Sequence, residues 1–97
     1  MAIPIPDEKT FAKIQQLVEE IYYSRDACEP DKIYELDRLA SPYPYMNDDR
    51  AVMRRSFDEY RSFKRQSKRA EAWSNVQSHA HKIAGLASIA RRVNPPA

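Results

Sequence analysis

Hydrophobic residues recur at intervals of three and four along most of the chain, which is the spacing of an amphipathic α-helix. The first such segment predicts a helix over residues 7–25, with Asp7 as the capping residue at its start. Its apolar positions are Phe11, Ile14, Leu17, Val18, Ile21 and Tyr22. A second, shorter helix is predicted to begin at Pro30, because proline fits a first turn, and to end before Ser41 and Pro42.

The second half of the chain has no proline between Asn47 and Asn94, so its helices are predicted to be long. One apolar seam consists of Met53, Phe57, Tyr60 and Phe63, and a later one consists of Trp73, Val76, Ala80, Ile83, Ala87 and Ala90. Residues 64–69 between the seams are all polar. We predict two helices near 48–67 and 71–93, with one continuous helix as the alternative. The pattern as a whole predicts an all-α fold, a small bundle of about four helices.

Prolines mark the segments that are not helical. Residues 1–6 are predicted to form an extended N-terminal arm, and residues 94–97 a C-terminal tail. The stretch 42–46 is predicted to carry the chain across to the third helix. Its two aromatic residues, Tyr43 and Tyr45, are candidates for contact with a partner; the alternative is that they lie over the bundle.

The composition fits a single small domain of 97 residues. With only one cysteine, Cys28, no disulfide within the chain is expected, and a reducing cytoplasmic location is the default. No apolar run is long enough for a membrane span, so no membrane partner is expected.

The charges are distributed unevenly, although the net charge is only +2. Residues 1–49 hold 5 basic and 11 acidic residues, a net of −6, and residues 50–97 hold 11 basic and 3 acidic residues, a net of +8. On a helical wheel of the third helix, five cations share one narrow arc. This basic stripe consists of Arg50, Arg54, Arg61, Arg65 and Lys68. It predicts a charged contact surface, unless the two halves of the chain neutralise each other.

Residues that commonly carry catalysis or hold metals are sparse. His79 and His81 are the only histidines, and on a helix they point about 200° apart, so they do not chelate one metal. Cys28 lies beside Asp26 and Glu29, whose charges do not favour a reactive thiolate. We therefore expect no metal, no cofactor and no enzymatic activity.

One local motif departs from that expectation. The run Ala80-His81-Lys82-Ile83-Ala84-Gly85-Leu86-Ala87 resembles the active helix of histidine-containing phosphotransfer domains. The resemblance implies His81 as the phospho-acceptor and Gly85 as the small neighbour that leaves its imidazole open. It covers about a quarter of the chain and departs from the family in two ways. Arg91 stands where the family has a second glycine, and the family has two further bundle helices after the motif, where this sequence has about sixteen residues.

Together these observations predict a non-enzymatic helical interaction module, such as an adaptor, regulator or small subunit. It is expected to dock on a protein partner or on a second copy of itself, with the basic stripe as a charged contact surface. Nucleic-acid binding through the same stripe is the first alternative, and phosphotransfer at His81 is the second.

Overall fold

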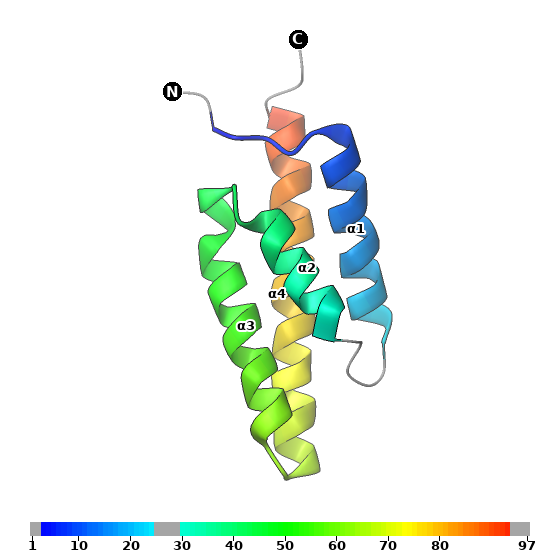
Figure 1. The fold of residues 1–97 in the computed structure, drawn as a ribbon, viewed down its shortest axis with the longest axis vertical. Helices are drawn as coiled ribbons and strands as arrows, with labels where there is room; N and C mark the ends of the chain where they lie inside the picture. Colours follow the sequence, from blue (N-terminus) through cyan, green and yellow to red (C-terminus); the bar gives the residue numbers. More distant parts are fainter. Residues whose placement is uncertain (1–2, 25–29, 94–97) are drawn as a thin grey trace.

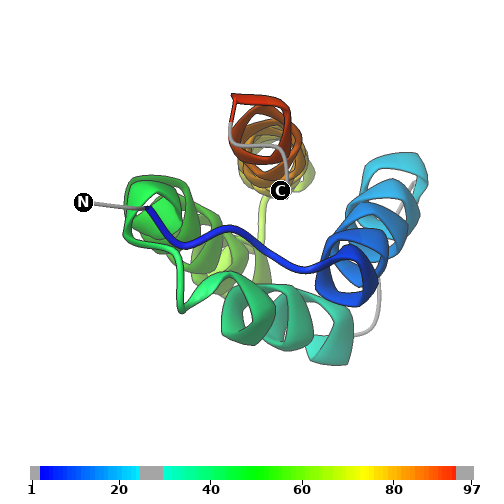
Figure 2. The same ribbon diagram turned by 90° about the horizontal axis from the view of Figure 1, so that it is seen from above.

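The computed structural model describes residues 3–24 and 30–93, and their regular secondary structure is entirely helical. The elements are α1 (Glu8–Tyr23), α2 (Pro30–Ala40), a short 3₁₀ helix η1 (Pro44–Met46), α3 (Asn47–Ser62) and α4 (Gln66–Val93). The prediction of a small all-α bundle with four helices is confirmed. Seen end on, α4 lies opposite α2, with α1 and α3 on either side (Figure 2).

The first helix begins where its cap was predicted. The Asp7 carboxylate accepts a hydrogen bond from the Thr10 backbone N–H at 2.7 Å, and this bond lowers the pKa of Asp7 below its usual 3.8. The helix ends at Tyr23, within the predicted range. Residues 3–7 are not helical, as predicted for the arm, whereas Cys28 and the tail 94–97 lie outside the described residues.

The crossover between the second and third helices is itself partly helical. Ser41 and Pro42 follow the end of α2, and residues 44–46 then form one turn of 3₁₀ helix that leads directly into α3. Met46 is fully buried at this point. The predicted end of the second helix is confirmed.

The third and fourth helices are separate, and the break between them lies earlier than predicted. The third helix ends at Ser62, and Phe63 has extended backbone angles, φ −72° and ψ 138°. The fourth helix begins at Gln66, so residues 63–65 alone make the turn. The predicted boundaries at 67 and 71 were therefore wrong by about five residues. Phe63, predicted to point into the core, is 37% exposed.

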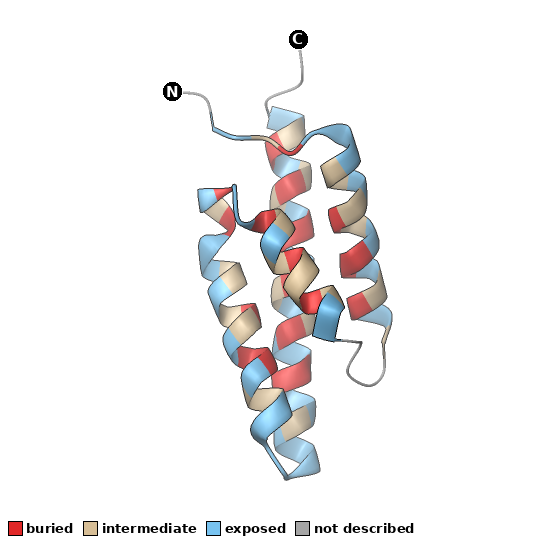
Figure 3. Cartoon of the chain, in the orientation of Figure 1, coloured by how far each residue is buried: buried red, intermediate tan, exposed pale blue. Residues whose placement is uncertain are grey.

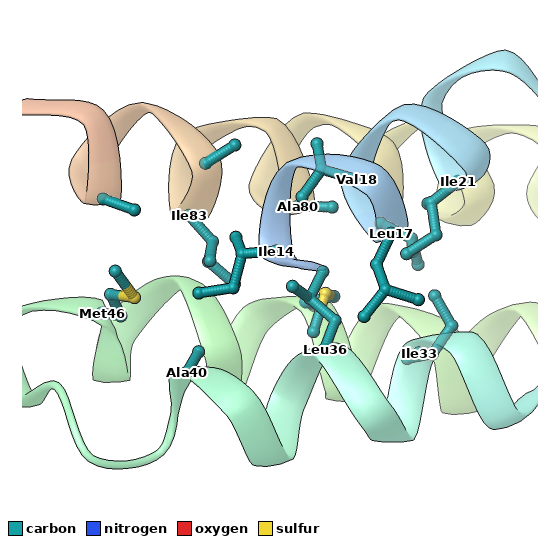
Figure 4. Close-up of a cluster of buried hydrophobic side chains, with 14 of the residues drawn as sticks. Ile14, Leu17, Val18, Ile21, Ile33, Leu36, Ala40, Met46, Ala80 and Ile83 are labelled. Atoms are coloured by element: carbon teal, nitrogen blue, oxygen red, sulfur yellow. The ribbon is translucent and has the colours of Figure 1, made fainter. Parts of the chain in front are cut away.

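The core runs along the centre of the bundle, and all four helices contribute to it (Figures 3 and 4). Its fully buried members include Ile14, Ile21, Ile33, Leu36, Met53 and Ile83. The fourth helix presents Ala80 and Ala87, both fully buried, to this core. Small side chains there let the backbone of α4 approach its neighbours closely, because a helix axis can come nearer where side chains are short.

The N-terminal arm crosses one end of the bundle, and the α3–α4 turn forms the other (Figure 1). The Tyr45 hydroxyl donates a hydrogen bond to the Pro4 carbonyl at 2.8 Å, and the Arg91 guanidinium donates one to the Pro6 carbonyl at 2.9 Å. At the opposite end α3 and α4 reach beyond α1 and α2 (Figure 1). None of the helices described is long and apolar enough to span a membrane.

Candidate functional site

The first two residues of the basic stripe, Arg50 and Arg54, face α2 within the molecule. Arg50 Nε lies 3.0 Å from Asp37 Oδ1, and Arg54 Nη1 lies 3.0 Å from Asp37 Oδ2. The Asp37 side chain is only 15% exposed, so this ion pair is shielded from solvent more than an ordinary surface pair. Here the acidic first half of the chain does neutralise cations of the second half.

The remaining stripe residues are divided by the turn. Arg61 is still on α3, where its guanidinium donates a hydrogen bond to the Tyr34 hydroxyl at 3.0 Å. Arg65 lies in the turn, and Lys68 lies in the first turn of α4. The helical wheel that predicted the stripe treated residues 50–69 as one helix. Because α3 ends at Ser62, the five cations do not form one stripe.

The structure gathers a different set of cations at the α3–α4 turn, here called the basic end and defined as residues 61–69. Its cations are Arg61, Lys64, Arg65, Lys68 and Arg69. Every residue of the basic end except Arg69 is exposed. The Arg69 guanidinium lies 4.7 Å from the centre of the Tyr60 ring. Sequence reasoning missed Phe63 as part of this surface, because Phe63 was assigned to the apolar seam of the third helix, which ends one residue before it.

The two tyrosines of the crossover lie over the bundle. Tyr43 is buried and its ring centre lies 6.1 Å from that of Tyr45, which is partly buried against the core. Burial raises the pKa of both hydroxyls above their usual 10.0. Tyr45 holds the N-terminal arm through Pro4, so both residues have partners within this molecule.

The two histidines have different surroundings. His79 Nδ1 lies 2.8 Å from Asp49 Oδ1, in a half-shielded contact between α4 and the start of α3. His81 is exposed, and its ring centre lies 5.6 Å from that of Tyr22 on α1. Among the described residues, no three His, Cys, Asp or Glu side chains are grouped so that they could hold a metal ion.

His81 borders an open groove between α1 and α4, with a volume of about 650 Å³. This α1–α4 groove is lined by Phe11, Val18, Tyr22, His81, Ala84 and Gly85, among others. A methyl group built on Gly85 would meet no atom within 4 Å, so the groove is empty above that residue. Tyr22 and Tyr23 at the end of α1 are 50% and 74% exposed.

Polar side chains of α4 and α1 tie the floor of the groove together. The Gln77 amide donates hydrogen bonds to the carbonyls of Ile21, Tyr22 and Ser24, at 3.0–3.2 Å, at the C-terminal end of α1, where carbonyl groups have no helical partner. Gln15 on α1 donates to the Ala84 carbonyl at 3.2 Å. The groove is therefore a fixed feature of the bundle and the two helices that form it are held at a set distance.

The rims of the groove carry opposite charges. Glu19 lies on the α1 side, and Lys82 lies on the α4 side, in the hollow that continues past Tyr22 and His81. Both are exposed, and neither has an ion-pair partner among the residues described. No family model, curated protein or solved structure matches this chain.

Proposed function

We propose that this protein is a non-enzymatic helical interaction module that docks on a second copy of itself through the α1–α4 groove. The observation that carries the proposal is the groove itself, an open apolar surface with exposed tyrosines on one rim and opposite charges on its two sides. Apolar surface of this kind is normally covered in a complex.

Charge complementarity selects the second copy and its orientation. A two-fold axis parallel to the helices places α1 of one copy against α4 of the other at the same height. Tyr22 and His81 are in contact, which shows that Glu19 and Lys82 lie at nearly equal heights. Glu19 of each copy then faces Lys82 of the other, whereas an axis across the helices would put α1 against α1 and leave like charges together.

Charge exchange between the two rims tests this arrangement. The wild-type chain of 11.3 kDa is expected to sediment as a dimer, and Glu19→Lys or Lys82→Glu alone is expected to weaken dimerisation at least tenfold. An equimolar mixture of the two variants is expected to form a heterodimer, because both rim pairs are then restored. Asp31→Lys and Arg55→Glu, exposed on other helices, are the matched controls and should leave the mass unchanged.

Filling the groove provides a second test. Gly85→Trp adds a large ring at a position where an added Cβ meets nothing within 4 Å and the groove is open to solvent, so the monomer should fold while the dimer is blocked. A wild-type protein that stays monomeric at millimolar concentration would contradict the proposal. So would a mixture of the two charge variants that fails to associate.

His81 supports a second candidate function, histidine phosphotransfer. The imidazole is exposed, and the open space above Gly85 leaves it accessible, as the resemblance to phosphotransfer domains requires. In such a step the His81 imidazole attacks the phosphorus of an aspartyl phosphate on a response regulator. The N–P bond forms as the carboxylate leaves.

Incubation with a phosphorylated response regulator tests this candidate. We would expect acid-labile phosphate on the wild type and on His79→Gln, and none on His81→Gln. His79 is the matched control because it is the other histidine of α4 and contacts Asp49. Absence of label on the wild-type chain would remove the candidate.

A further inference from the structure

The basic end projects from the rest of the molecule. The lower ends of α3 and α4 reach past the start of α2 and the end of α1, and this part of the bundle is almost wholly exposed (Figures 1 and 3). Residues 61–68 are all exposed, although they join α3 and α4, the two helices that pack most extensively against each other. A partner can therefore approach the basic end from several sides.

The basic end has an excess of positive charge that the fold does not neutralise. Its nine residues carry five cations and no carboxylate, and the flanking acids are Glu59 and Glu71. The ion pairs among the described residues lie elsewhere in the molecule, on α1, α2, the first half of α3 and, at His79, the middle of α4. Lys64, Arg65 and Lys68 have no ion-pair partner in that set.

Two of the guanidinium groups are held in place by aromatic residues. Arg69 lies over the Tyr60 ring at 4.7 Å, and Arg61 lies 5.8 Å from the Phe57 ring centre while it donates to the Tyr34 hydroxyl. Such contacts fix a cation without removing its charge. Less conformational entropy is then lost when an anion binds, because the side chains are already ordered.

Two cations of the basic end lie where positive charge lowers the stability of α4. Lys68 and Arg69 lie in its first turn, where the helix dipole is positive, and this turn has no acidic residue. Acidic residues in the first turn would stabilise such an end, and α1 and α3 both have them, Glu8 in α1 and Asp48 and Asp49 in α3. A bound anion would supply the missing negative charge.

An aromatic ring lies among these cations. Phe63 is 37% exposed in the turn, directly before Lys64 and Arg65. On its other side it borders a small hollow of about 130 Å³ that Lys68 lines together with Glu59 and Glu71, so a bound strand would lie on the side of Lys64 and Arg65. Cations that follow a phosphate backbone beside an aromatic ring that stacks on a base are the usual elements of a single-strand binding surface.

We propose that the basic end binds single-stranded nucleic acid, with backbone phosphates on its five cations and one unpaired base stacked on Phe63. A duplex hides its bases from such a ring, and a single phenylalanine offers little surface to a lipid bilayer. An acidic protein surface would engage the cations but has no need of a stacked ring. The proposed contacts involve phosphates and one base but not the 2′-hydroxyl of the sugar, so RNA and DNA strands are expected to bind in the same way.

Charge reversal at the basic end is the first test. Fluorescence anisotropy with labelled dT20 and U20 is expected to show binding whose log affinity falls with log salt at a slope of about −3.5, for five phosphates on a single strand. Lys64→Glu/Arg65→Glu/Lys68→Glu should abolish most binding and lower any remaining slope to about −1.4, for two phosphates. Lys9→Glu/Arg38→Glu/Arg92→Glu changes the net charge equally on exposed residues elsewhere and should retain at least a third of the affinity.

The ring is tested separately. Phe63→Ala should fold normally, because the side chain is already exposed, and should weaken dT20 and U20 binding about five- to tenfold. On an abasic strand of equal length, wild type and Phe63→Ala should bind alike, because no base is present to stack. A structural role for Phe63 would instead lower both affinities equally.

Several results would overturn the proposal. They are absence of salt-dependent binding, equal loss in the control triple variant, tighter binding to a duplex of the same sequence, and stronger competition by polyglutamate or anionic vesicles than by dT20. The affinities for dT20 and U20 are expected to be similar, because the proposed contacts do not involve the 2′-hydroxyl. Because the Glu19→Lys variant keeps an intact basic end, its binding of dT20 separates failure here from failure of the dimer.

Discussion

Asp37 is the residue on which the contact between α2 and α3 depends most directly. Its carboxylate accepts from two guanidinium groups at 3.0 Å each and is largely shielded from water. Loss of the charge would leave Arg50 and Arg54 partly buried without a counter-ion. Such losses cost more than an exposed ion pair, because the remaining charges keep their desolvation penalty.

We expect Asp37→Asn to lower the free energy of unfolding by about 1–3 kcal/mol, because a hydrogen bond to a charged partner is exchanged for a weaker neutral one. Urea denaturation followed by circular dichroism measures the change. Asp58→Asn is the control, since Asp58 is exposed on α3 and should change stability by less than about 0.5 kcal/mol. Equal effects of the two substitutions would contradict the role given to Asp37.

The crossover tyrosines make stability dependent on alkaline pH. Burial raises the pKa of Tyr43 and of Tyr45 in the folded state above the usual 10.0, so the folded chain holds these protons more tightly than the unfolded chain. Their contribution is therefore complete below pH 10 and is lost as pH rises through the folded-state pKa. We expect thermal stability to fall above pH 10.

The double substitution Tyr43→Phe/Tyr45→Phe separates this effect from general alkaline unfolding. Without the two hydroxyls, the decline in melting temperature above pH 10 should become shallower than in the wild type. Tyr23→Phe is the matched control, because that tyrosine is 74% exposed, and it should leave the pH profile unchanged. Parallel profiles for the wild type and the double variant would show that neither hydroxyl is responsible.

Among the elements, α4 carries both the core seam and the open side of the groove. Its alanines are buried on one face, while Gly85 lies on another face with empty space above it. The backbone at Gly85 does not adopt a positive φ, so the fold does not require a glycine there. A glycine within a helix is costly because the unfolded chain gains extra freedom.

Gly85→Ala should therefore raise the free energy of unfolding by about 0.5–1 kcal/mol. Chemical denaturation of the monomeric Glu19→Lys background measures this without a contribution from association. Ala84→Gly at the neighbouring buried position is the reverse comparison and should destabilise the helix. A neutral or destabilising Gly85→Ala would mean that the position is more crowded than the open space indicates.

The sequence pattern predicted the elements well where local signals decide them, and failed where tertiary contacts do. Asp7 and Pro30 mark their helix starts by capping and by proline geometry, which act within one turn. The end of α3 carries no proline or glycine. Phe63 continues the apolar spacing there, so periodicity alone extends the helix past the residue at which the chain turns.

The candidate sites, too, could be predicted only as far as local sequence signals determine them. The cations of residues 61–69 are visible in the sequence, but their gathering at one end depends on where the turn falls. Likewise, Asp37 is twelve or more residues from the arginines that it pairs with, and no local pattern indicates the pairing. The α1–α4 groove joins Phe11 to Gly85 across most of the chain, so only the packed bundle reveals it.

At the scale of the whole molecule, the two surfaces lie on different parts of an elongated bundle about 50 Å in length. The α1–α4 groove lies between two helices along its side. The basic end is at one pole (Figure 1). A two-fold axis parallel to the helices leaves the direction of each bundle along that axis unchanged. Both basic ends of the proposed dimer therefore point the same way.

That geometry predicts bivalent binding of a strand long enough to reach both basic ends. Once one end is bound, the second binds at a high effective concentration, so the wild type should bind dT40 far more tightly than dT10. Glu19→Lys should bind dT10 as the wild type does but lose at least tenfold of the preference for dT40. A longer strand also offers more positions at which one basic end can bind. This effect is the same for the wild type and for Glu19→Lys, so it cancels when their preferences are compared.

Mixing Glu19→Lys with Lys82→Glu provides the decisive control for that prediction. The mixture restores both rim pairs and should recover the preference for dT40, although neither variant alone shows it. If the mixture dimerises and the preference does not return, the two basic ends do not bind one strand together, and the bivalent geometry is wrong. If the monomeric variants still prefer dT40 over dT10 as strongly as the wild type does, the preference does not depend on dimerisation of the protein.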